Sequence, residues 1–111
     1  MDYSLDRRRE AVVVAVRGRV DESSWVAFGV GLSEAIEQAK QAGVRNVIID
    51  LAGLEYMSSR GLRVLTVAKR EGEDAGTNVS LASPNEVMRE ILAISRYDKL
   101  FTIHETVEAA H

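Results

Sequence analysis

The chain alternates short runs of consecutive apolar residues with longer segments in which apolar residues recur every three or four positions. The runs at residues 11–16 (AVVVAV) and 44–51 (VRNVIIDL) are typical of strands buried on both faces. A weaker strand is expected around residues 3–7, and others over 78–82 and 100–103. No helical segment separates the first two strands, so we expect them to pair as an antiparallel hairpin.

The first segment with helical spacing follows the polar loop around Asp21. Ser23 or Ser24 is expected to cap this helix, and Gly43 to end it, because glycine is favoured just past a helix C-terminus. Its apolar stripe recurs at i, i+4, i+7, i+8 and i+11, at Phe28, Leu32, Ala35, Ile36 and Ala39.

Two further helices are predicted from the same kind of evidence. The second ends near Gly72, and its stripe consists of Gly61, Val64, Leu65 and Ala68. The third begins with Ser83-Pro84-Asn85-Glu86, where a capping serine, a proline at the first position and a glutamate at the third form a capping box. Its inner face is predicted to contain Val87, Met88, Ile91, Leu92 and Ser95.

Strands that alternate with helices of about 12 residues indicate parallel pairing through right-handed crossovers. We therefore expect an α/β fold: a mixed, mostly parallel central sheet of four to five strands packed by about four helices, the last over residues 106–110. Since the chain has no repeat and no low-complexity linker, residues 1–111 are predicted to form a single domain.

Composition excludes several classes of function. There is no cysteine and there are only two histidines, so thiolate metal sites, disulfides and a histidine proton relay are not expected, and no cofactor is predicted. The net charge of −3 argues against a nucleic-acid partner. No apolar run reaches the length of a membrane span and the N-terminus does not resemble a signal peptide. We expect a cytoplasmic protein without direct membrane insertion.

The stretch LEYMSSRGLRVL, residues 54–65, stands where a predicted strand becomes a predicted helix. In open α/β sheets, ligands and chemistry collect at this edge. Ser58 and Ser59 have several possible roles. They suit an ordinary helix cap, or a modified site where helix N–H groups face an added phosphate. They do not match a nucleophile elbow or a phosphate-binding loop, since the required glycines are missing, and an enzyme is not predicted.

The stretch DLAGLEYMSSRGLRVL, residues 50–65, resembles the central motif of STAS domains, above all the bacterial anti-sigma factor antagonists. GRVDESS, residues 18–24, looks like the family's segment before its first helix, and SRYDKLFTIHETVEAA, residues 95–110, is similar to its closing segment. The resemblance therefore covers nearly the whole chain. It implies a STAS fold and a non-enzymatic role in transcription regulation.

The resemblance also implies site residues. The family's phosphoacceptor falls on Ser59, with Ser58 as the alternative because many relatives have aspartate there. Asp21 matches an acidic residue expected close to the acceptor. The predicted phosphate environment and partner-binding surface consists of Asp21, Ser58, Arg60, Gly61, Leu62 and Arg63. The arginines depart from the family pattern, which usually has small residues at these places.

The implied mechanism is partner switching. The unphosphorylated antagonist binds an anti-sigma factor, which is a serine kinase, and a sigma factor or another client is released. The kinase phosphorylates the serine and ends the complex, and a serine phosphatase resets it. The alternative is a non-phosphorylated STAS scaffold, or a regulatory subunit of a multiprotein assembly or transporter.

Three side chains near the motif leave two interpretations open. Trp25 suits either a core position or an interface hot spot. Met57 and Leu62 form an apolar rim for a partner if they are exposed, and belong to the core if they are buried.

Overall fold

The computed structural model describes all 111 residues and contains one five-stranded sheet in the order β1-β2-β3-β4-β5. Strand β1 runs antiparallel to β2, and the other neighbouring pairs are parallel, so the predicted hairpin and mostly parallel sheet are confirmed. The strands are β1 (Asp2–Arg7), β2 (Ala11–Val20), β3 (Asn46–Met57), β4 (Asn78–Ala82) and β5 (Ile103–His104).

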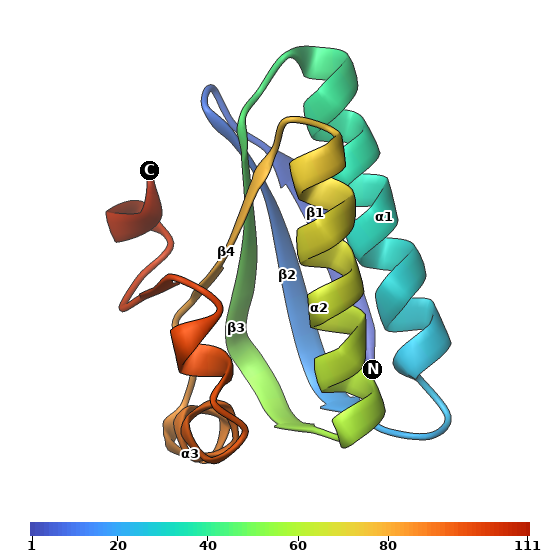
Figure 1. The fold of residues 1–111 in the computed structure, drawn as a ribbon, viewed down its shortest axis with the longest axis vertical. Helices are drawn as coiled ribbons and strands as arrows, with labels where there is room; N and C mark the ends of the chain where they lie inside the picture. The colour runs from blue at the N-terminus through green and yellow to red at the C-terminus, as the bar shows by residue number, and fades with distance from the viewer.

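Helices α1 and α2 lie side by side on one face of the sheet, whereas α3 lies across one end of it (Figure 1). None of the helices is long and apolar enough to cross a membrane. The helical elements are α1 (Trp25–Ala42), α2 (Ser59–Asp74), α3 (Glu86–Ile94) and the 3₁₀ turns η1 (Tyr97–Lys99) and η2 (Glu108–Ala110).

The end of the chain differs from the sequence-based expectation. The helix predicted over residues 106–110 is a single 3₁₀ turn, η2. The predicted last strand is shorter and begins later, at Ile103, because the chain is still turning when it reaches Phe101, whose N–H bonds the Tyr97 carbonyl oxygen. Phe101 is buried in the core instead of extending the strand.

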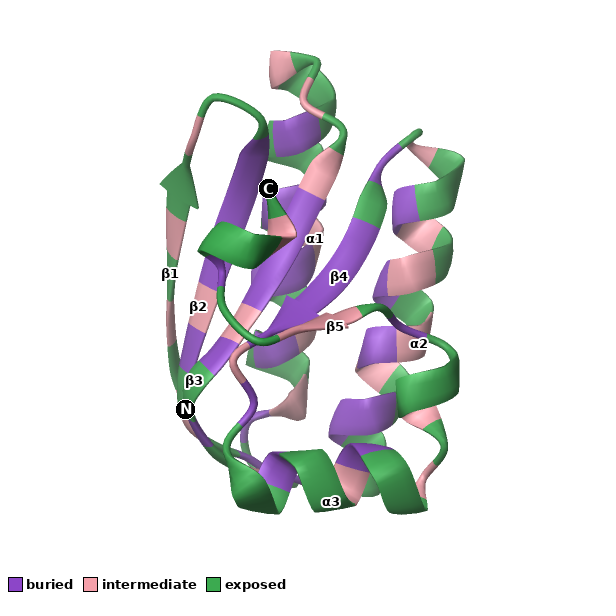
Figure 2. Cartoon of the chain, turned by 90° about the vertical axis from the view of Figure 1, so that its left-hand side faces the viewer, coloured by how far each residue is buried: buried purple, intermediate pink, exposed green.

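Strand β2 divides the core into two parts because successive side chains of a strand point to opposite faces. Val12, Val14 and Val16 are buried in the main core with α1 and α2. Val13, on the opposite face, belongs to a smaller cluster with Val107 of the C-terminal segment. Figure 2 shows this segment crossing the face that α1 and α2 leave open.

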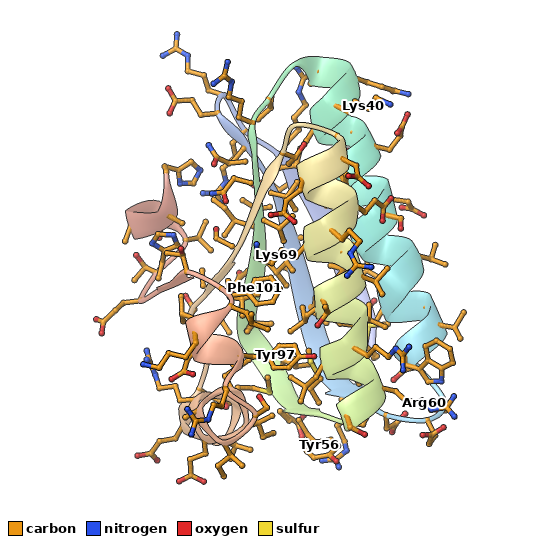
Figure 3. The ribbon with its side chains drawn as sticks, viewed as in Figure 1. Lys40, Tyr56, Arg60, Lys69, Tyr97 and Phe101 are labelled. Carbon is orange, nitrogen blue, oxygen red and sulfur yellow. The ribbon has the colours of Figure 1, made fainter.

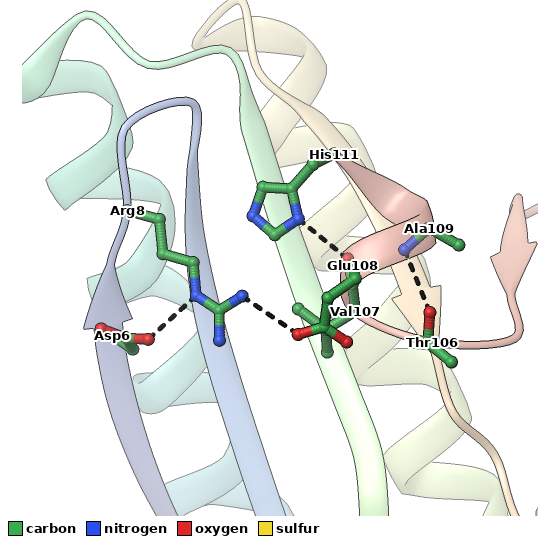
Figure 4. A network of polar contacts seen from close by, with 7 residues as sticks. All are labelled: Asp6, Arg8, Thr106, Val107, Glu108, Ala109 and His111. Atoms are coloured by element: carbon green, nitrogen blue, oxygen red, sulfur yellow. Dashed lines mark hydrogen bonds and ion pairs between the residues drawn. The ribbon is translucent and has the colours of Figure 1, made fainter.

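Polar contacts hold the C-terminal segment near the β1–β2 hairpin (Figure 4). The Arg8 Nε donates to the Asp6 carboxylate at 3.0 Å, while Arg8 Nη1 lies 3.6 Å from the Glu108 carboxylate. Both carboxylates hold the pKa of Arg8 above its usual value, Asp6 with the larger effect. Such exposed ion pairs contribute little to stability, because solvent screens them. Burial of Val107 is therefore the stronger restraint on the segment.

Strand β3 extends beyond its neighbour β4. The β3–β4 pairing ends at Asp50 and Ala82, whereas β3 pairs with β2 as far as Met57. The Asn85 side-chain amide, just before α3, donates to the Leu54 carbonyl oxygen at 2.9 Å. Asn85 thus satisfies a backbone acceptor on the part of β3 that has no β4 neighbour.

The predicted capping box of α3 is wrong. Ser83 has a φ of +57°, and its hydroxyl donates to the Glu105 carbonyl oxygen instead of capping the helix. The N-cap is Asn85, whose side-chain oxygen Oδ1 accepts from the Met88 N–H at 2.8 Å. Met88 and Leu92 form the buried face of α3, whereas Val87, predicted to lie on that face, is exposed.

The predicted side-chain cap of α1 is also wrong. Ser24 occupies the N-cap position, but its hydroxyl makes no bond to the helix N–H groups. It donates instead to the Arg19 carbonyl oxygen at 2.9 Å. The predicted C-terminal end of α1 is confirmed, with Gly43 in the left-handed conformation at a φ of +70°. The stripe from Phe28 to Ala39 is buried as expected.

Asn85→Ala is expected to lower the free energy of unfolding by about 1–2 kcal/mol, because it removes both the α3 cap and the bond to Leu54. Ser83→Ala, at the position that the sequence predicted as the cap, is the matched control and should cost less, about 0.5 kcal/mol, because it removes only the exposed bond to Glu105. Urea denaturation of both variants measures the difference. Equal losses would contradict the assignment of the cap to Asn85.

Candidate functional site

The candidate site is the junction between β3 and α2. The last parallel pair of β2 and β3 joins Val20 to Met57. The next residue, Ser58, then donates its backbone N–H to the Val20 carbonyl oxygen at 2.8 Å. The loop of residues 20–24 and the first turn of α2 are therefore neighbours at the same edge of the sheet. The structure brings together the two segments that the sequence analysis singled out.

Ser58 and Ser59 have different environments. Ser58 is the N-cap of α2: its hydroxyl oxygen accepts from the Gly61 N–H at 3.3 Å, and its carbonyl oxygen accepts from Leu62. Ser59 is the first residue of the helix and is exposed, with no side-chain hydrogen bond. The N–H groups of the first turn at Ser59 and Arg60 have no partner within the helix. The only uncommitted hydroxyl of the pair is that of Ser59, and it stands where a helix attracts anions.

Asp21 organises the neighbouring loop. Its carboxylate accepts from the Ser23 N–H at 3.0 Å, from the Ser23 hydroxyl at 2.8 Å and from the Ser24 hydroxyl at 3.1 Å. The bonds from Ser23 are the largest cause of a lowered Asp21 pKa, with the Ser24 hydroxyl contributing further. The carboxylate stays ionised at neutral pH and belongs to the loop that lies beside Ser58.

Arg60 links the first turn of α2 to the loop and to α1. Its Nε lies 3.5 Å from the Glu22 carboxylate, and its guanidinium stacks over the Trp25 ring at 5.2 Å from the ring centre. Figure 3 shows Arg60 at the outer corner where the two helices begin. Trp25 is half-buried, so it has both the core contact and the surface contact between which the sequence left a choice.

The apolar residues of the motif belong to the core. Met57 is 2% exposed and Leu62 is 9% exposed, so the apolar rim does not form, and Leu62 does not present the partner-binding surface predicted for it. Gly61 is buried as well. A Cβ there would lie 2.5 Å from Met57 Cγ and 2.7 Å from Val20 Cγ1, so only glycine fits where α2 meets the strand ends.

The remaining predicted residue, Arg63, is exposed and makes no ion pair. The contact that the sequence analysis missed is Glu22, which binds Arg60 across a separation of 38 residues. A carboxylate next to Asp21 was visible in the sequence, but no pattern indicated its partner. No group of three or more histidine, aspartate or glutamate side chains is placed to hold a metal ion.

The fold and this strand–helix junction define a STAS domain. The model of the STAS domain family matches residues 2–110, and the chain belongs to that family. The chain is 29% identical over 96 residues to the anti-sigma F factor antagonist of Lysinibacillus sphaericus, covering 86% of this chain and 80% of that protein.

Two solved structures of SpoIIAA, a cell fate determinant of Bacillus, are also similar. The unphosphorylated form, described as an anti-sigma factor antagonist, is 25% identical, with a TM-score of 0.77, over 98% of this chain and 92% of that one. The phosphorylated form has a TM-score of 0.68 at the same identity, over 98% of this chain and 96% of that one. The predicted family and fold are confirmed, and relatives of this kind are regulatory proteins and not enzymes.

Gly61→Ala is expected to lower the free energy of unfolding by about 1–3 kcal/mol, because its methyl group overlaps Met57 and Val20. Gly29→Ala, in the half-buried first part of α1, is the matched control, since its Cβ would meet Val64 at an ordinary 3.6 Å. That variant should gain up to about 1 kcal/mol from helix propensity. Thermal denaturation of the two variants gives opposite shifts, and a stable Gly61→Ala variant would contradict the tight junction.

Proposed function

We propose that the chain is an anti-sigma factor antagonist that acts by partner switching, with Ser59 as its phosphoacceptor. The observation that carries the proposal is the difference in hydrogen bonding and exposure between the Ser58 and Ser59 hydroxyls. The Ser58 hydroxyl oxygen accepts the capping hydrogen bond from the Gly61 N–H of α2, whereas the Ser59 hydroxyl is exposed and makes no hydrogen bond. A kinase reaches the Ser59 hydroxyl without unfolding the junction.

The position also explains how the fold survives the modification. A phosphoserine carries a charge of about −1.5 to −2 at pH 7. At the first residue of α2 this charge meets the unpaired N–H groups and the positive end of the helix dipole, which favour anions. The exposed Arg63 guanidinium on the next turn has no competing carboxylate. The added charge is therefore stabilised locally, and its main effect is on what the surface binds.

The proposed partner is an anti-sigma factor with serine kinase activity, and the complex forms while Ser59 is unmodified. Ser58, Arg60 and Arg63 lie within one turn of Ser59 along the chain, and Asp21 belongs to the neighbouring loop. Together they form the proposed docking surface, with Gly61 keeping the junction tight. A phosphate within about 4 Å of a partner carboxylate costs several kcal/mol at an effective dielectric of 20. This weakens a complex by about a hundredfold or more. A serine phosphatase restores the binding form, and the cycle takes place in the cytoplasm.

The acceptor is tested by incubating the chain with an anti-sigma factor serine kinase that binds it, and with Mg-ATP. We expect Ser58→Ala to keep the phosphate acceptor and Ser59→Ala to lose it, as measured by intact mass and peptide sequencing. Circular dichroism of both variants confirms that loss of the α2 cap has not unfolded the substrate. Phosphate on Ser58 alone would move the acceptor, and no phosphate on either serine would overturn the antagonist role in favour of a scaffold.

Ser59→Asp is expected to bind the kinase at least about tenfold more weakly than the unmodified chain, since it supplies one of the charges of a phosphate. Ser59→Asn has nearly the same shape without the charge and serves as the control. Calorimetric titration of the kinase with each variant separates charge from shape. Equal weakening by both variants would show that steric fit, and not charge, governs the complex.

A further inference from the structure

A groove of about 870 Å³ runs between α1 and α2, on the face of the two helices that points away from the sheet. Three valines on its walls are strongly exposed: Val26 at 60%, Val30 at 50% and Val67 at 59%. Gly29, Val64 and Ala68 also line it. Three exposed apolar side chains that line one groove favour an interaction site over scattered surface exposure.

Gly29 supports an interaction role for the groove. A glycine in a helix interior costs roughly 0.5–1 kcal/mol relative to alanine. Nothing in the fold requires this glycine, since an added Cβ would touch only Val64, at 3.6 Å. By contrast, Gly31 on the same helix leaves room for the Tyr3 ring. Gly29 keeps the groove deep, which matters for an occupant and not for the fold.

Positive and negative side chains lie at opposite ends of the groove. Arg60 and Arg63 lie at the end where both helices begin, beside Trp25. Glu34 and Glu71 lie at the other end, where the Ser33 hydroxyl donates to Glu71 at 2.9 Å. The eight residues from Arg63 to Glu71 span about 12 Å along α2. Neither Arg63 nor Glu71 is neutralised by an ion pair within the molecule.

We infer that the occupant of this groove is a second copy of the chain, packed antiparallel about a two-fold axis. In that arrangement the arginine end of each copy meets the glutamate end of the other, and both ends are matched by the same operation. The ridge formed by Val26 and Val30 on one α1 enters the groove of its partner, as ridges pack into grooves between helices. The result is a four-helix layer between two sheets, and the inference does not rest on the proposed function.

The charge pattern makes a specific test possible. Arg63→Glu places glutamates at both ends of the groove, and Glu71→Arg places arginines at both ends, so each variant repels itself. We expect each to self-associate at least about tenfold more weakly than the wild type by analytical ultracentrifugation. An equimolar mixture of the two restores opposite charges at both ends, and should associate like the wild type.

Val30→Asp, in the groove, should also abolish association, whereas Val87→Asp is the matched control on α3 with a similar exposure of 51%. Circular dichroism melts verify that each variant is folded. A wild-type chain that stays monomeric at submillimolar concentration would overturn the inference, as would a mixture that fails to regain association. A monomer whose groove binds a fluorescent fatty acid or an amphipathic peptide would likewise overturn it and identify a different occupant.

Discussion

The hydrogen bond from the Ser58 N–H to the Val20 carbonyl oxygen is the contact on which the arrangement of this surface depends. It continues the pairing of β2 and β3 by one residue beyond Met57, at the point where both strands end. Two segments that are far apart in the sequence thereby share one edge, with the loop around Asp21 on one side and the first turn of α2 on the other. Without this register, Ser59 would have no defined neighbours, and Arg60 would not reach Glu22 and Trp25.

The junction combines a rigid interior with an accessible exterior. Gly61 lets α2 start directly against Met57 and Val20, and those side chains fill the space beneath the turn. The Ser58 cap fixes the direction in which the helix leaves. Because Met57 and Val20 pack against the first turn of α2 and Ser58 caps it, a charge added at the exposed Ser59 stays outside the core. The proposed switch therefore changes a surface and leaves the fold intact, which is what reversible partner exchange requires.

Periodicity predicted the parts of the fold that depend on burial. The stripe of α1 and the strand over residues 78–82 follow from apolar spacing, because burial of apolar side chains decides which face of an element turns inward. The N-terminal hairpin was predicted because no helical segment separates the first two strands. The helix caps were harder to predict, since the hydroxyls of Ser83 and Ser24 donate to carbonyl oxygens of other segments. Tertiary competition of this kind leaves no local signal. The family motif pointed to Ser59 as the predicted acceptor, whereas the difference in hydrogen bonding between Ser58 and Ser59 could be seen only in the structure.

Arg60 and Arg63 lie between the proposed phosphoacceptor and the groove, and their surroundings differ. Arg60 is already committed to Glu22 and Trp25, so a phosphate on Ser59 must compete with an ion pair and a stacked ring for its guanidinium. Arg63 has no such partner, so it can bind an added anion without breaking an existing ion pair. A phosphate that draws Arg63 toward Ser59 also removes a cation from the arginine end of the groove. If Ser59 is phosphorylated as proposed, Arg63 couples the two proposed surfaces through its charge alone, with no movement of the backbone.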